Sequence, residues 1–234
     1  MRQSGAGKVC GRIGWESVKA NVVPMVVLWI LAVATAFAYY FVPGVAAGLE
    51  PLKTWQTESG WVAAFLNRTF FCGVLPGVFL VTVKSIRPRR PFATVAAQTL
   101  WCGVWGVVFD FYFRLLDRVF GSGCDFATLL AKAAADEFGI TLLVSAPADA
   151  VFFFWLGRDF SFRRARAEWP RSFYRDLVAP NLISNWCVWI PVSMAVFAFP
   201  LPLQIQVSGF AAAFWTLMCL QIGMRTARKE ERVS

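Results

Sequence analysis

The sequence lacks histidine altogether, and only 16% of its residues are charged. No two of its cysteines form a Cys-x-x-Cys pair; they are Cys10, Cys72, Cys102, Cys124, Cys187 and Cys219. Without histidine or paired cysteines, a zinc site, a haem ligand set or a Ser-His-Asp triad is not expected. We therefore expect no metal and no cofactor, and we interpret the cysteines as small apolar residues.

The scarcity of charge is matched by an excess of apolar residues, which make up 58% of the chain. Soluble domains are nearer half apolar and a quarter charged, so both values indicate a membrane protein. The net charge of +9 could suggest a nucleic-acid partner. The charges, however, lie in clusters between apolar runs and not along one amphipathic face, so no nucleic-acid binding is expected.

Long apolar runs dominate the chain, and each is close to the roughly 20 residues that a helix needs to cross a bilayer core. Backbone groups in lipid must pair within their own segment, which predicts helices. We predict an all-α, polytopic transmembrane bundle, 21–225, between basic segments 1–20 and 226–234. Six spans are expected, with four as the main alternative. The six runs are Val22–Val42, Trp61–Val83, Ala93–Leu116, Phe138–Leu156 (extended toward its N-terminus), Leu182–Phe199 and Ile205–Met224.

Most Lys and Arg residues fall into four clusters separated by pairs of these runs. The positive-inside rule then predicts both termini on the cytoplasmic or matrix side. The clusters are Arg2, Lys8, Arg12 and Lys19; Lys84, Arg87, Arg89 and Arg90; Arg158, Arg163, Arg164, Arg166, Arg171 and Arg175; and Arg225, Arg228, Lys229 and Arg232.

Arg68, Asp110 and Asp149 are among the ionisable residues inside the apolar runs, where a charge is costly unless it is paired or hydrated. Arg68 and Asp110 come to a similar depth, roughly 10 Å below the outer surface at 1.5 Å per residue. We predict that they form an ion pair, the alternative being an unpartnered, snorkelling Arg68. Asp149 follows Pro147. It is either a pore or relay carboxylate in a hydrated cavity, or it reaches the basic loop at Arg158 and Arg163.

Two stretches of the sequence resemble the Mpv-seventeen and peroxisomal-membrane-protein family, over residues 100–225. The first is CGVWGVVFDFYFRLLDRVFGSG, Cys102–Gly123, followed by the ADEFG segment. The second runs from WPRSFYRDL to the FAFPLP segment. The residues at family motif positions are Gly103, Gly106, Tyr112, Leu116, Asp117, Arg118, Asp136, Glu137, Gly157, Asn185, Trp189, Pro191, Phe197, Pro200 and Trp215.

The sequence departs from the family pattern at Val107, Asp110, Ser193, Val196 and Gln204, which replace proline, histidine, glutamine, asparagine and arginine. The resemblance implies a divergent member of a family of small integral proteins, in a bacterial inner, mitochondrial inner or peroxisomal membrane. It also implies a regulated, weakly selective pore and no enzymatic activity. The pore or cavity candidates are Arg68, Asp110, Asp149, Asn185 and Ser193.

Three classes of function are compatible with these features. The first is a channel for small solutes or ions. The second is a non-conducting scaffold whose basic loop binds anionic lipids or partner proteins. The third, a membrane enzyme with a metal cluster of Asp117, Asp136 and Glu137, matches no motif and is not favoured. Candidate partners are the lipid bilayer, a small-molecule or ion permeant, and further copies of the chain in a homo-oligomer.

Overall fold

The computed structural model describes residues 22–83 and 87–216. The predicted terminal segments, the first and last basic clusters and the end of the sixth predicted span lie outside these ranges. No strand occurs in either range. The elements are α2 (Val22–Phe41), α3 (Val45–Ser59), α4 (Trp61–Arg68), η1 (Thr69–Val74), α5 (Leu75–Thr82), α6 (Pro91–Phe120), α7 (Phe126–Ala135), η3 (Asp136–Ser145), α8 (Ala146–Leu156), α9 (Phe162–Ala167), η4 (Tyr174–Val178), α10 (Ala179–Phe197) and a helix over 201–216.

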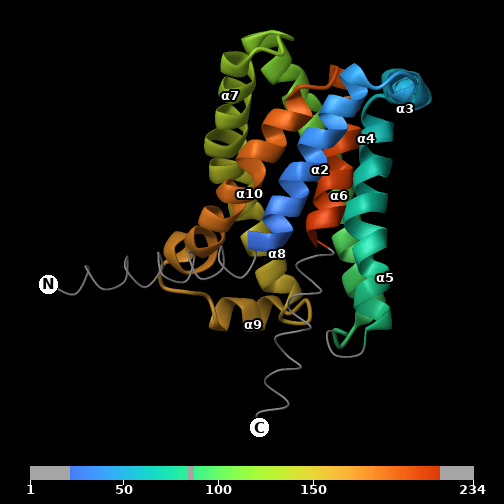
Figure 1. Ribbon diagram of the computed structural model, residues 1–234. Coiled ribbons are helices and arrows are strands. Elements are labelled where there is room, and N and C mark those ends of the chain that lie inside the picture. The colour runs from blue at the N-terminus through green and yellow to red at the C-terminus, as the bar shows by residue number, and fades with distance from the viewer. Residues whose placement is uncertain (1–21, 84–86, 217–234) are drawn as a thin grey trace, which may run out of the picture.

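The long helices run alongside one another in a single bundle (Figure 1). The elements α4, η1 and α5 form one continuous rod, and α7, η3 and α8 form another. The short helix α3 lies at one end of the bundle, and α9 lies across the other (Figure 1). The segments η1, η3 and η4 are π-helical, a widened form of the helix that occurs frequently at functional sites.

Three described helices are long and apolar enough to cross a membrane: Trp61–Thr82, Pro91–Phe120 and Phe126–Leu156. A fourth span arises if α2 and α3, which meet at a bend of 102°, are counted as one. The prediction of six spans was therefore too high for the described residues. The apolar part of α10, Asn185–Phe197, is too short, because it extends only about 20 Å at 1.5 Å per residue.

The first predicted span corresponds to α2, which qualifies as a membrane span only together with α3, across the bend that follows α2. Pro43 and Gly44 follow the helix, and Gly44 adopts a left-handed conformation with φ of 89°. That conformation carries little cost for glycine and ends a helix. The chain then turns into α3, a helix that the apolar pattern did not predict.

The distribution of side chains is the reverse of that in a soluble protein. Large apolar side chains are exposed on the outside of the bundle, among them Val23, Phe92, Leu100 and Phe111. Polar and ionisable side chains are buried inside it: Gln56, Asn67, Asp110, Lys132, Asp136, Glu137, Ser193, Gln204, Gln206 and Ser208. An apolar surface of this extent needs an apolar solvent. The chain is an all-α helical membrane protein, as predicted.

Glycines allow α6 to pack closely against the rod of α4 and η1. A methyl group added at Gly103 would lie 2.5 Å from the Phe65 ring and the Thr69 hydroxyl. One added at Gly106 would collide with the Ala64 carbonyl and the Arg68 side chain. Small residues permit such backbone approach in membrane helices. These two glycines therefore let α6 approach the helix that carries Arg68.

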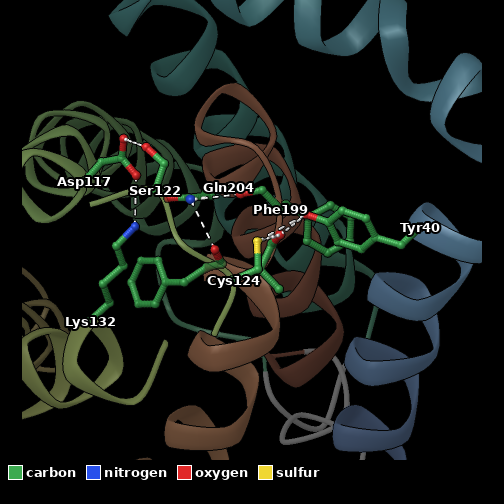
Figure 2. Close-up of polar contacts among 9 residues, drawn as sticks. Tyr40, Asp117, Ser122, Cys124, Lys132, Phe199 and Gln204 are labelled. Atoms are coloured by element: carbon green, nitrogen blue, oxygen red, sulfur yellow. Dashed lines mark hydrogen bonds and ion pairs between the residues drawn. The ribbon is translucent and has the colours of Figure 1, made fainter. Parts of the chain in front are cut away.

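Polar contacts join the helices at the end of the bundle that contains the α6–α7 turn, which we call the capped end (Figure 2). The Tyr40 hydroxyl donates to the Ala198 carbonyl and lies near the Cys124 sulfur. The Gln204 amide donates to the Phe199 carbonyl at 2.9 Å. These contacts link α2, the α6–α7 turn and the turn after α10.

A buried ion pair lies near the same end (Figure 2). The Lys132 ammonium is 2.9 Å from one Asp117 oxygen, and Ser122 donates to the other oxygen at 2.8 Å. Lys132 is only 1% exposed. The pair fixes α7 against the end of α6.

Candidate functional site: a polar cavity inside the bundle

A cavity of about 190 Å³ lies among the helices. We call it the polar cavity, because ionisable or hydroxyl and amide side chains make up most of its lining. Four of the five pore candidates from the sequence line it, namely Arg68, Asp149, Asn185 and Ser193. Asp110 does not. The other lining residues are Phe109, Phe113, Asp136, Glu137, Thr141, Ser145, Trp189, Val196 and Ser208.

Two adjacent carboxyl groups begin the π-helical segment η3 and line this cavity. The Ser193 hydroxyl donates to Asp136 at 3.1 Å, and the Asn185 amide donates to Glu137 at 2.8 Å. Both carboxyl groups are more than nine-tenths buried. Their partners come from α10, so α10 and η3 form one wall together.

Asp149 is held by two indole groups of α6. Trp101 and Trp105 donate to the same Asp149 oxygen at 2.6 and 2.9 Å. The alternative in which Asp149 reaches the basic loop is therefore wrong. Arg158 instead contacts Glu168, with an N–O distance of 3.0 Å. Asp149 thus lines the cavity from α8 and does not pair with the basic loop.

The predicted ion pair between Arg68 and Asp110 does not form. The Asp110 carboxylate pairs with Arg114, one helical turn along α6, at 3.0 Å. The Arg68 guanidinium donates to Ser208 at 3.0 Å and lies 5.3 Å from the centre of the Phe109 ring. Arg68 and Asp110 do not pair despite their similar predicted depth, because Arg114, four residues after Asp110 on the same helix, is its nearer partner.

A chain of buried amides, not foreseen from the sequence, connects Asp110 to the other helices. Asn67 donates to Gln206, Gln206 donates to Gln56, and Gln56 donates to Asp110. The N–O distances are 2.6, 2.6 and 3.0 Å. Buried polar groups in this environment require such partners. The chain ties α3, α4, α6 and the 201–216 helix together beside the cavity.

Two residues that line the polar cavity, one basic and one acidic, each have a buried atom without a hydrogen-bond partner. These atoms are the Arg68 Nε and the Asp136 Oδ1. No ion pair joins Arg68 to a carboxylate within the described residues. Both atoms are buried by their neighbours, so neither faces the open space of the cavity.

Two further hollows lie in the described part of the bundle, and we call the end of the bundle that contains α9 the basic end. The middle hollow, of about 240 Å³, shares four lining residues with the polar cavity: Thr141, Ser145, Asp149 and Asn185. The basic hollow, of about 660 Å³, is lined by Arg87, Arg89, Arg158 and Arg164. Phe153 lines both the middle and the basic hollow. Two of the predicted basic clusters thus share one end.

The remaining motif residues are spread along the bundle. Trp189 lines the polar cavity, while Phe197 packs edge-on against Phe113 at 5.1 Å between ring centres. The Tyr112 hydroxyl donates to the Ala135 carbonyl at 2.8 Å. Four others have structural positions: Arg118 in the last turn of α6, Pro191 within α10, Pro200 in the turn before the 201–216 helix, and Trp215 packed against the core.

The metal cluster considered from the sequence is not assembled. Asp117 pairs with Lys132 near the capped end, whereas Asp136 and Glu137 line the cavity. Across residues 22–83 and 87–216, no group of three or more acidic or cysteine side chains is placed to hold a metal ion. The structure therefore offers no support for the metal-dependent alternative.

Comparison with known proteins adds no assignment. No protein-family model matches the chain, and no characterised protein or solved structure matches it either.

Proposed function

We propose that this membrane protein is a weakly selective conduit for small solutes or ions, in a bacterial inner, mitochondrial inner or peroxisomal membrane. The proposal includes membership of the Mpv-seventeen and peroxisomal-membrane-protein family, which the sequence resembles. The observation that carries it is the polar cavity, which lies within an apolar bundle and shares four lining residues with a second hollow.

The energetics of the bilayer favour a hydrated role for this cavity. Ionisable side chains at membrane depth are costly and typically mark substrate or ion pathways. Here one guanidinium and three carboxyl groups surround a single space. Asp136 and Glu137 begin a ten-residue π-helical segment. A functional cavity explains both the charges and the irregular helix, while a purely structural bundle needs neither.

The hollows suggest access from one side. Contacts between the helices join them at the capped end, among them the Lys132–Asp117 pair. Toward the basic end, by contrast, Phe153 is the side chain shared by the last two hollows. In this proposal the solute enters from the basic end, which the positive-inside rule assigns to the cytoplasm or matrix. Passage to the other side requires the capped end to open.

A liposome flux assay tests the proposal. Purified protein is reconstituted, and the efflux of small labelled solutes of graded size is measured. We expect leakage that Asp149→Ala abolishes and that Asp110→Asn leaves intact, because Asp110 does not line the cavity. Liposomes that stay tight at high protein load would rule the conduit out.

One observation favours the second candidate, a scaffold that binds anionic lipids or partners. Helix α9 carries three arginines beside exposed aromatic side chains: Phe162 is 76% exposed and Trp169 is 45% exposed. Such a segment suits the membrane interface, where each basic residue contributes about 1 kcal/mol on an anionic surface. Retention of a defined partner or of anionic lipid that depends on Arg163 and Arg166, together with tight liposomes, would favour this role.

A further inference from the structure

We propose that the basic hollow binds the headgroup of an anionic phospholipid, with the lipid phosphate between Arg89 and Arg164. The inference does not depend on whether the protein conducts solutes. It also concerns a different surface from the scaffold role, because Arg163 and Arg166 of α9 do not line this hollow. It is carried by an excess of arginine in a hollow that lies where three membrane spans end.

The lining of the basic hollow carries more positive than negative charge. Its basic side chains are Arg87, Arg89, Arg158 and Arg164. Two carboxylates, Asp159 and Glu168, line the same hollow, so two positive charges remain in excess. Glu168 pairs with Arg158 at 3.0 Å, which leaves Asp159 as the one carboxylate of this lining for the other three arginines. The hollow therefore favours an anionic ligand.

Arg89 and Arg164 share a single carboxylate oxygen. The Nη1 atom of each lies 3.3 Å from the Asp159 Oδ2 atom. The two guanidinium groups are therefore close enough to bind one phosphate together, and a guanidinium group matches phosphate oxygens with paired N–H donors. The Arg89 and Arg164 side chains are 80% and 58% exposed. Exposed ion pairs contribute little to stability, so a phosphate replaces the carboxylate at low cost.

The hollow lies at the depth of the lipid headgroups. Its lining includes Leu80 from the last turn of α5, Thr94 from the first turn of α6 and Leu156 at the end of α8. These are the ends of the three helices that are long and apolar enough to cross a membrane. The exposed aromatic side chains Phe162 and Trp169 lie at the same end, and aromatic residues favour the membrane interface. The N-terminus of α6 adds a partial positive charge there.

An apolar side of the hollow distinguishes a lipid from a soluble phosphate ester. Leu80, Phe153 and Leu156 line it together with the arginines. A phospholipid places its phosphate on the arginines and the start of its acyl chains along these apolar side chains, which a soluble ester would leave uncovered. The volume of about 660 Å³ is roughly four times that of a cavity that accommodates benzene. Basic pockets between transmembrane helices on the cytoplasmic or matrix side bind anionic lipid headgroups.

Native mass spectrometry of the full-length protein in neutral detergent tests the inference, because it counts the bound lipid molecules. The probes are phosphatidylglycerol, phosphatidylcholine with the same acyl chains, and glycerol phosphate, which has the phosphate but no chains. We expect one phosphatidylglycerol to bind at least about tenfold more tightly than either other probe. Equal affinity for phosphatidylcholine would overturn the anionic headgroup. Equal affinity for glycerol phosphate would overturn the lipid and favour a soluble ligand.

Paired variants assign the binding to the hollow. Arg89→Gln/Arg164→Gln should weaken phosphatidylglycerol binding at least about tenfold, because both guanidinium contacts with the phosphate are lost. The matched control Arg163→Gln/Arg166→Gln removes two charges from the same end but outside the hollow, and it should weaken binding less than about threefold. Equal losses in the two variants would indicate a general attraction of the surface and would overturn the site.

A third variant releases the two arginines without removing them. Asp159 has a left-handed backbone conformation with φ of 55°, which asparagine tolerates. Asp159→Asn should therefore keep the local fold and tighten phosphatidylglycerol binding about threefold or more, because the phosphate no longer competes with a carboxylate. The control Asp176→Asn removes a carboxylate from an exposed arginine pair outside the hollow. Weakened or unchanged binding in Asp159→Asn, or an equal gain in Asp176→Asn, would contradict the site.

The lipid-binding and flux results are separable. Liposomes that stay tight refute the conduit and leave the lipid site in place. Loss of selectivity for phosphatidylglycerol refutes the lipid site, whatever the flux.

Discussion

Lys132 and Asp117 form a buried ion pair. Removing Asp117 should lower the free energy of unfolding more than removing Lys132 does. Asp117→Ala leaves an ammonium that is 1% exposed without a counter-ion. Loss of one partner of a buried pair costs about 3–5 kcal/mol, because the other charge remains desolvated. In a chain of this size each kcal/mol lowers the midpoint of thermal unfolding by about 2–4 °C. We therefore expect the midpoint of Asp117→Ala to fall by about 10 °C.

The reverse deletion should be milder. Lys132→Met keeps the apolar stem in place and leaves Asp117, which is 19% exposed and accepts a hydrogen bond from Ser122. We expect a cost of about 1.5–3 kcal/mol, the range of a lost hydrogen bond to a charged group. The double variant Asp117→Asn/Lys132→Met leaves no buried charge, so it should be more stable than Asp117→Ala.

Thermal unfolding in detergent, followed by size-exclusion chromatography of heated samples, measures these differences. The matched control is Glu50→Ala, which breaks the exposed Glu50–Lys53 pair on α3 and should cost less than about 1 kcal/mol. The reasoning fails if Lys132→Met is the more damaging single change. It also fails if Asp117→Ala behaves like Glu50→Ala.

Two further predictions concern packing and capping. Gly106→Ala should destabilise the protein by about 1–3 kcal/mol, because the added methyl collides with the Ala64 backbone; Gly48→Ala, which meets nothing within 4 Å, should not. Thermal unfolding of the pair decides this, and equal midpoints would contradict it. Asp125 caps α7, and hydrogen bonds from Thr128 lower the pKa of its carboxyl group. The cap therefore stabilises fully above the ordinary aspartate pKa and is lost as the pH falls through the lowered one. Midpoints measured against pH should show this loss in the wild type but not in Asp125→Ser, and identical profiles would refute it.

The sequence predicted best what depends on length and apolarity. Three helices match predicted runs, because a stretch such as Trp61–Thr82 is apolar over most of its length. The sequence also identified Arg68 and Asp149 as cavity residues, because each is a charged side chain within an apolar run. A charge within such a run requires a polar surrounding, wherever the partner lies.

The sequence did not predict which buried side chains form hydrogen bonds or ion pairs with one another. Asp110 pairs with its neighbour Arg114, and Gln56 reaches it from α3, a helix too polar to be noticed as part of the bundle. Asp136 and Glu137 were considered from the sequence as metal ligands together with Asp117, and not as cavity residues. The π-helical geometry of η3, visible only in three dimensions, brings both into the cavity.

The proposed conduit requires a polar cavity that lies within lipid-embedded helices and can be reached from the basic end. Cysteine labelling tests it most directly, with Ser145→Cys in a background without other cysteines and a charged, membrane-impermeant thiol reagent. Arg164→Cys marks the basic end, and Cys124, restored alone, marks the capped end. We expect Ser145→Cys to react only from the side of the membrane on which Arg164→Cys reacts. Reaction only from the side of Cys124, or from neither side, would contradict it.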